Sequence, residues 1–229
     1  MASSGTSATT LVRPARGGDP TSISAVQARA WRMAYGNLLP EATLEALTPE
    51  ALLPAWRRAV SEPPSAKHAV LVAVADDIVV GFAAVGPSQD RDAVDTDGQL
   101  AVLAVDPLHQ RDGHGSRLLS AVVEHLRDHG LTALTAWIPE GDLARTAFLR
   151  SAGMLPDGAR RSYEGAEQAT VVEIRFSADL AAPEAGSDDA AADAQPPGVQ
   201  ALDVQALDVR NHTIQDAKTE DAAVPDPQG

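Results

Sequence analysis

The chain of 229 residues contains no cysteine, which excludes a disulfide framework, a thiolate nucleophile and a zinc site built on cysteines. Long apolar runs are also missing, because no stretch approaches the roughly 18 residues of a membrane span. The N-terminal residues lack the basic region and apolar run of a secretory signal. We therefore expect a cytoplasmic protein without a membrane partner.

Positive charge is scarce: the net charge is −14, which argues against a nucleic acid or an anionic membrane surface as a partner. The acidity is unevenly placed. Ten acidic and two basic residues lie from residue 181 to the end, so this segment carries more than half of the net charge. The remainder is only mildly acidic and is long enough for one well-cored domain, which we expect over residues 10–177.

Both ends of the chain differ from this domain in composition. Residues 1–9 are small and polar and predict a flexible N-terminus. Residues 178–229 are rich in Ala, Asp and Pro and lack aromatic residues, so they cannot bury enough apolar area to offset chain entropy. We expect a disordered acidic tail. The alternative is a short partner-binding patch around Leu202 and Leu207, within a pentapeptide that occurs twice in succession.

Hydrophobic periodicity predicts strands interleaved with helices. The expected strands are 10–15, 69–75, 78–85, 100–105, 131–138, 160–163 and 170–176, and the expected helices are 19–36, 38–61, 116–126 and 142–152. Pro14 suggests an edge strand, and Asp19 and Thr48 are suited to cap helices. This order indicates an α/β domain of about three layers.

The most informative stretch is residues 100–126. An apolar run ends at Asp106-Pro107, a polar loop carries Gly113 and Gly115, and apolar residues then recur at helical spacing. A helix start leaves about four backbone N–H groups unpaired and carries partial positive charge. Glycine lets the backbone approach a ligand closely. The segment therefore predicts phosphate or pyrophosphate binding. The alternative is an ordinary strand-to-helix turn whose glycines only relieve backbone strain.

Two common phosphate motifs do not fit this loop. No Lys follows the glycines as in a Walker loop, and Leu118 stands where a Rossmann fingerprint needs a third glycine. What remains, Gln110-x-x-Gly113-x-Gly115, resembles the acetyl-CoA signature Q/R-x-x-G-x-G/A of the GNAT superfamily of N-acetyltransferases. The order of elements also resembles the GNAT acyl-CoA N-acyltransferase fold, in which helices flank a mixed central sheet.

The resemblance implies a site for acetyl-CoA as acyl donor. In that family the strand before the glycine loop splays from its neighbour, and the pantetheine arm lies in the gap and bonds to strand backbone, as an added β-strand would. A second motif, Asp142-x5-Phe148, resembles the family's N-x5-F-Y-x-x-x-G-F, with Asp in place of Asn. The implied cofactor-binding residues are Leu103, Ala104, Val105, Gln110, Arg111, Asp112, Gly113, His114, Gly115, Ser116 and Asp142.

The resemblance does not identify the catalytic residues. Leu149 stands where a Tyr often protonates the departing CoA thiolate, and Gln99 lies near the position of a catalytic Glu in some members. An ammonium with a pKa of ~10.4 must lose a proton before it attacks, so a base or a water chain is needed. The candidates for the base are Glu41, Asp95, Asp97 and Tyr163, and the candidate for lining the acceptor pocket is Tyr35.

Two functions follow from the resemblance. The first is an N-acetyltransferase that moves an acetyl group directly from acetyl-CoA to a primary amine, on a small molecule or a protein. The second is a catalytically silent GNAT-like module that binds acyl-CoA for regulation, which Leu149 favours. No histidine spacing suggests a metal site, and we expect His109, His125 and His129 to be exposed. The acceptor and the oligomeric state stay open, with a homodimer as one option.

Overall fold

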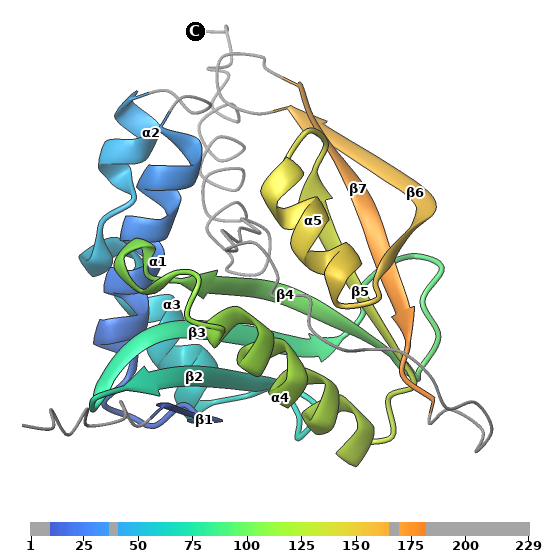
Figure 1. The fold of residues 1–229 in the computed structure, drawn as a ribbon, viewed down its shortest axis with the longest axis horizontal. Coiled ribbons are helices and arrows are strands. Elements are labelled where there is room, and N and C mark those ends of the chain that lie inside the picture. The colour runs from blue at the N-terminus through green and yellow to red at the C-terminus, as the bar shows by residue number, and fades with distance from the viewer. Residues whose placement is uncertain (1–9, 37–40, 165–169, 182–229) are drawn as a thin grey trace, which may run out of the picture.

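A mixed sheet organises the part of the chain that the computed structural model describes, residues 10–36, 41–164 and 170–181. Helices cover both faces of this sheet (Figure 1). The predicted α/β fold, a mixed central sheet flanked by helices, is confirmed. The elements in chain order are β1 Thr10–Pro14, α1 Pro20–Tyr35, α2 Glu41–Ala46, α3 Pro49–Ser61, β2 Ala69–Ala75, β3 Ile78–Pro87, β4 Asp97–Val105, the 3-10 helix η1 Pro107–His109, α4 His114–Asp128, β5 Ala133–Pro139, α5 Leu143–Ser151, β6 Leu155–Glu164 and β7 Thr170–Asp179.

The strand order is β1-β2-β3-β4-β5-β7-β6, and within this sheet only β4 and β5 pair in parallel. β1 lies at an edge, as Pro14 predicts, because proline cannot donate to a sheet ladder. A tight turn joins β2 and β3. Its two residues, Asp76 and Asp77, have φ angles of 46° and 65°. Such left-handed backbone suits the right-handed twist of a two-residue hairpin.

Two separate cores hold the helices to the sheet. On one face, Trp31 of α1 and Trp56 of α3 pack with Phe82 of β3. On the other face, α4 presents Leu118, Val122 and Leu126, each 0 % exposed, to the sheet, and α5 joins the same core. The 3.6-residue spacing of the apolar residues in α4 explains this one-sided burial.

Local capping differs in part from the sequence prediction. Thr48 caps α3 as expected, since its side-chain oxygen accepts a hydrogen bond from the Ala51 N–H at 3.2 Å. This cap also divides the expected single helical region into α2 and α3. Asp19 precedes α1 but makes no capping bond with its side chain. Its carboxylate accepts two hydrogen bonds from Arg13 instead, so the predicted cap is wrong.

The final strand ends later than predicted. β7 continues to Asp179, and Leu180 is 5 % exposed within the α4 core. The Leu180 N–H donates to Thr132 O at 2.7 Å, and Arg127 Nε donates to Leu180 O at 2.8 Å. The domain therefore extends beyond the expected boundary at residue 177, because these backbone bonds hold its last residues. The predicted flexible N-terminus, and residues 182–229 of the tail predicted over 178–229, lie outside the described residues.

Candidate functional site

The two halves of the sheet are joined by a short parallel contact between β4 and β5. The contact comprises three residue pairs, of which Gln99 and Thr135 form the last. Beyond this pair β4 keeps β3 as its neighbour, whereas β5 keeps β7. Figure 1 shows the two halves meeting at the lower right and diverging toward the centre of the view. The strand before the glycine loop thus separates from its neighbour.

A β-bulge in β4 lies next to this point of separation. Val85 of β3 pairs with Leu100, and Ala84 pairs with Val102, so Ala101 is an extra residue without a partner on β3. A bulge bends a strand and increases its local twist. Beyond it, the side chains of Leu103, Ala104 and Val105 are buried in the two cores. Backbone groups of these residues, and not their side chains, border the gap.

The loop after β4 is fixed by Asp106, which is 4 % exposed. Its carboxylate caps η1 by accepting the Leu108 N–H at 3.0 Å, and it also accepts a 2.9 Å hydrogen bond from Arg29 Nε of α1. The loop then turns through left-handed backbone, with a φ of 70° at Arg111 and 75° at Gly113. Gln110 reaches back toward Val105 O at 3.4 Å. The loop is therefore built as a sharp return from the strand into α4.

Helix α4 starts directly at this loop with unpaired amides. The first amide that bonds back within the helix is Arg117 N–H, which donates to Gly113 O at 3.1 Å. The amides of His114, Gly115 and Ser116 precede it and have no acceptor within the helix. The guanidinium of Arg117 donates to Asp112 O at 2.7 Å and adds a positive charge beside them. This arrangement fits a pyrophosphate.

Arg117 is a residue of the site that the sequence reasoning missed. The glycine signature ends at Gly115, and a cation two residues later has no fixed place in it. A basic side chain in the first turn of a helix interacts unfavourably with the helix dipole, so its presence there suggests a role in binding. That unfavourable position was the signal in the sequence. The loop therefore offers both amides and cations, since Arg111 is exposed beside it.

His114 has the least expected environment in the loop. Its side chain is buried, with the residue 4 % exposed, and its Nδ1 has no hydrogen-bond partner. Burial lowers the pKa of His114 below its usual 6.5, and the nearby charge of Arg117 lowers it further. The imidazole is therefore neutral at pH 7. A buried ring nitrogen without a protein partner in the described chain lies beside the amides that suit an anion.

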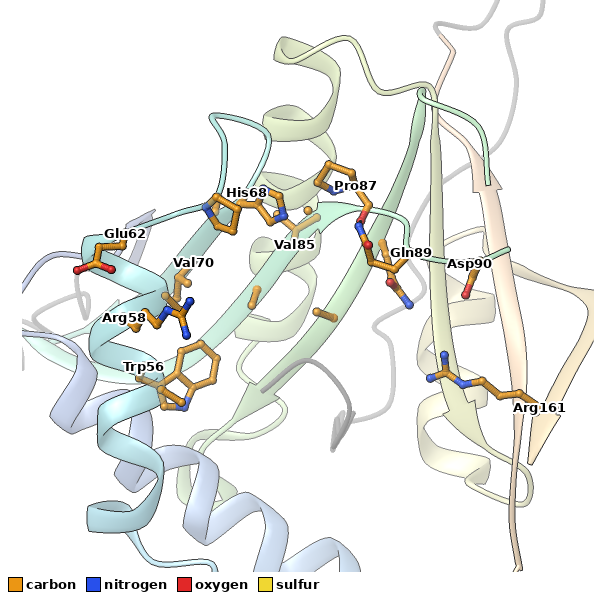
Figure 2. A pocket seen from close by; sticks show the side chains of 18 residues that line it. Trp56, Arg58, Glu62, His68, Val70, Val85, Pro87, Gln89, Asp90 and Arg161 are labelled. Atoms are coloured by element: carbon orange, nitrogen blue, oxygen red, sulfur yellow. The ribbon is translucent and has the colours of Figure 1, made fainter. Parts of the chain in front are cut away.

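A cavity of about 840 Å³ lies on the face of the sheet that carries α3. Its floor is made of small apolar residues of β2 and β3, and Trp56 lies at one end. Figure 2 shows Arg58 and Arg161 directed toward the cavity from opposite sides. Gln99 and Ala101 of β4 also line it, so the cavity adjoins the point where β4 and β5 separate.

Charged residues fix the wall of the cavity opposite α3. Asp90 accepts hydrogen bonds from Trp137 Nε1 at 3.0 and 3.1 Å, and Arg175 Nη1 approaches the same carboxylate at 3.1 Å. Arg175 also pairs with Asp92 at 2.7 Å, and this bond is the main reason why the pKa of Arg175 is raised. The guanidinium of Arg161 stacks over Trp137 at 4.2 Å from the ring centroid. These hydrogen bonds, ion pairs and the stacking contact therefore hold the side chains of this cavity wall in one conformation.

A family model described as "Acetyltransferase (GNAT) family" matches residues 28–154, more than half of the chain and all of the strand, loop and helix described above. The chain belongs to the GNAT acetyltransferase family. This assignment confirms the family, the fold and the acetyltransferase class that the sequence predicts, with acetyl-CoA as acyl donor.

Individual relatives agree with the assignment. An uncharacterized N-acetyltransferase of Bacillus subtilis, YuaI, is 28 % identical over 129 residues, which cover 56 % of this chain and 71 % of that protein. The ribosomal-protein-alanine N-acetyltransferase of Brucella melitensis has a TM-score of 0.59 at 23 % identity, over 74 % of this chain and 99 % of that one. YncA of Salmonella typhimurium, solved with its cofactor acetyl-CoA, has a TM-score of 0.58 at 20 % identity, over 80 % and 99 %. These two structural likenesses show the fold.

Three positions depart from the usual GNAT motif, namely Asp142, Leu149 and Met154, and the first two bear on the site. Asp142 caps α5, since its Oδ1 accepts the Arg145 N–H at 2.9 Å, and its other oxygen pairs with the Arg145 guanidinium at 3.1 Å. Its carboxylate is therefore already engaged within α5. Leu149 is 2 % exposed in the core below α4. A leucine there cannot supply the proton that a tyrosine would give to a departing thiolate.

The other predicted residues are spread over the fold. Glu41 is exposed on α2, Asp95 is exposed, and Asp97 accepts the Val94 N–H at 3.0 Å. None of these three carboxylates belongs to the residues that line the cavity. The side chains of Tyr35 and Tyr163 lie outside the described residues.

The histidines are less exposed than predicted. His109, His125 and His129 are partly buried, so the expectation that they are exposed is wrong. The rings of His125 and His129 stack with centroids 4.3 Å apart, which explains part of their burial. Within the described ranges no three metal-ligating side chains come together, and no helix there is long and apolar enough to cross a membrane.

Proposed function

We propose that this GNAT protein transfers the acetyl group of acetyl-CoA directly to a primary amine, on a small molecule or a protein. The observation that carries the proposal is that the gap between β4 and β5 and the cavity beside α3 meet at one point of the sheet. The gap between β4 and β5 leads there from the glycine loop, and the cavity beside α3 adjoins it through Gln99 and Ala101. A donor and an acceptor can therefore approach from different sides without a covalent enzyme intermediate.

In this proposal the donor is held mainly by backbone. The amides of His114, Gly115 and Ser116 bind the pyrophosphate, together with the backbone of residues 111–113 and the side chain of Arg117. The pantetheine arm lies along the backbone of Leu103–Val105, where β4 has no β5 neighbour. The fit is supported by the unpaired Nδ1 of His114, which is a buried polar atom beside the expected phosphates.

The chemistry does not require a general acid from the side chain at position 149. A neutral amine attacks the thioester carbonyl, a backbone N–H near the bulge at Ala101 polarises the carbonyl oxygen, and CoA departs as the thiolate. Orienting the two reactants can supply a large share of the rate enhancement. The burial of Leu149 is therefore compatible with activity, because a thiolate is a good enough leaving group to depart without a general acid.

The test is the release of free thiol from acetyl-CoA in the presence of a panel of alkyl amines, amino acids and peptides with free amino groups. We expect thiol release with at least one acceptor, at a rate that saturates with the acceptor. The matched control is the same panel with each amino group acetylated beforehand, which must give only background hydrolysis. Tight binding of acetyl-CoA without turnover on any acceptor would contradict transfer and favour the silent module.

A further inference from the structure

His68 is a cavity-lining residue with no assigned role. It ends the turn that leads into β2, where its backbone N–H donates to Ser65 O at 3.0 Å. Figure 2 shows its imidazole beside Val85 and Pro87 at the cavity wall. The ring lies so close to Gly86 that a Cβ built on this glycine would stand 2.5 Å from Cδ2 and 3.0 Å from Nε2 of His68. The absence of a side chain at Gly86 therefore makes room for the imidazole.

The register of the sheet relates His68 to the expected reaction centre. Gly86 of β3 pairs directly with Gln99 of β4. Directly opposed residues of antiparallel strands point to the same face, with Cβ atoms about 4.5–5.5 Å apart. Because His68 Nε2 occupies the space in front of Gly86, it lies on the same face as the Gln99 side chain and one strand away. Gln99 in turn forms the last pair with Thr135 before β4 and β5 separate.

Two features of its surroundings bear on the tautomer and the charge of His68: a hydroxyl beside Nδ1, and burial. Its Nδ1 lies 2.9 Å from Ser65 Oγ, which also accepts the Lys67 N–H at 3.3 Å. In the tautomer in which Nδ1–H of His68 donates to Ser65 Oγ, Nε2 carries the lone pair, which faces Gly86 and the cavity. Burial lowers the pKa of His68 below 6.5, so the ring is neutral at pH 7.

Most charged groups around the cavity have partners elsewhere, whereas the exposed Arg58 is directed toward the cavity (Figure 2). Asp90 is engaged by Trp137 and Arg175 on the opposite wall. Arg161 of β6 pairs with Glu173 at 2.7 Å, and Arg58 and Glu62 belong to the exposed end of α3. Lys67 Nζ donates to Asp95 O at 3.2 Å. No ion pair of the described residues joins His68 to a carboxylate, so no carboxylate there stabilises its charged form through an ion pair.

We propose that His68 is the general base of the transfer, taking the place of the strand carboxylate that this chain replaces with Gln99. The assignment rests on the proposed function. His68 Nε2 removes one proton from the ammonium of the acceptor and becomes an imidazolium. The amine nitrogen forms a bond to the carbonyl carbon, and the bond from that carbon to sulfur breaks. The second proton of the nitrogen neutralises the thiolate, and the imidazolium returns its proton to water.

The pH dependence of kcat/KM in His68→Gln tests this step. With an alkyl amine, the unaltered protein should hold a plateau from below pH 6.5 up to the pKa of the amine, because the base is neutral and the amine is charged. The variant should lose about 10²-fold or more at pH 7. Its rate should then rise with pH across the former plateau, because only the free amine reacts. An arylamine, which is already neutral at pH 7, should show a much smaller loss.

Controls separate this inference from the proposed function. His129→Gln removes the histidine at the C-cap of α4, which does not line the cavity, and should keep the profile of the unaltered protein. Acetyl-CoA affinity, measured by calorimetry, should be unchanged in His68→Gln, which also shows that the variant is folded. Ser65→Ala keeps the imidazole of His68 but removes the hydroxyl that lies 2.9 Å from its Nδ1. This variant should shift the acid limb of the pH dependence of kcat/KM.

Each outcome of these experiments bears either on the assignment of the base or on the proposed function. A plateau that persists in His68→Gln, or equal losses with alkyl and aryl amines, would overturn the assignment of the base while leaving transfer intact. If His68→Gln does not fold, an unshifted acid limb in Ser65→Ala would overturn it. Absence of transfer to every amine by the unaltered protein would instead refute the proposed function and the inference with it.

Discussion

At the scale of residues, the glycine loop makes one position especially sensitive. Gly115 is the second residue of α4, it is buried, and its amide belongs to the unpaired group at the helix start. Side chains of a helix tilt toward its N-terminus, so we expect a side chain added at Gly115 to lie near the space in which the helix amides would receive an anion. Because the neighbouring Arg117 and the helix dipole both favour negative ligands, a fixed negative charge at this point competes directly with the ligand.

Gly115→Glu should therefore abolish the binding of acetyl-CoA. A carboxylate about 4 Å from a phosphate costs roughly 4 kcal/mol at a surface-like dielectric, or about a thousandfold in affinity. Titration calorimetry measures the change. Gly115→Ala is the matched control, because the family signature accepts alanine here, and it should retain binding. Unchanged affinity in a folded Gly115→Glu protein would contradict the assignment of the start of α4 as the pyrophosphate site.

The sequence could identify Gly113 and Gly115 because their role depends on local backbone. The positive φ of Gly113 and the helix that follows are both encoded within a few residues. The burial of His114 and the place of His68 at the cavity could not be found in this way. Both depend on segments distant in the chain, such as the pairing of Gly86 with Gln99, which no local pattern specifies.

At the scale of elements, Asp142 at the start of α5 has one role implied by the family resemblance and another observed in the structure. The family resemblance implies that Asp142 contacts the cofactor, whereas the structure has its carboxylate on the first turn of α5. A cap and a ligand contact make different demands. The cap needs only an oxygen that accepts the Arg145 N–H, which asparagine also provides, whereas the ion pair needs the charge.

Two substitutions at this position separate the roles. Asp142→Ala should lower the free energy of unfolding by about 1 kcal/mol, because it removes the cap. Asp142→Asn keeps a capping oxygen and restores the residue usual in the family motif, so it should lose less stability and bind acetyl-CoA at least as well. Thermal melts and calorimetry on both variants measure this. Equal destabilisation by Asn and Ala would show that the ion pair with Arg145, and not the cap, matters.

Elements were predictable where apolar spacing and turn residues agree. The strands on either side of Asp76-Asp77 and the helix with Leu118, Val122 and Leu126 are examples. The fate of Asp19 was not predictable, because its choice of Arg13 over the helix amides depends on how β1 approaches α1. The bulge at Ala101 also has no sequence signal, since it is a property of the pairing between β3 and β4.

At the scale of the whole molecule, the described domain ends with Leu180. This residue is 5 % exposed and is bonded through its backbone to Thr132 and Arg127. Most of the net negative charge follows it in the chain. We expect the segment from residue 182 onward to be dispensable for folding and for cofactor binding, because its composition cannot supply a core.

Two truncations differing by a few residues test this boundary. A chain ending at Ala181 should melt within a few degrees of the full chain and bind acetyl-CoA equally well. A chain ending at Ser177 also loses the buried Leu180, worth roughly 1.5–3 kcal/mol, and should melt roughly 5–10 °C lower. A large fall in the first truncation would show that the acidic segment contributes to the core.

The short contact between β4 and β5 has a consequence for any bound coenzyme. Three residue pairs are a narrow backbone connection between two halves of a sheet. An arm that bonds along β4 in the opening would add backbone hydrogen bonds where β4 has no β5 neighbour. Acetyl-CoA would then be both a reactant and a structural part of the protein. The free energy of its binding would add to that of folding, by about 2.7 kcal/mol at a hundredfold excess over Kd.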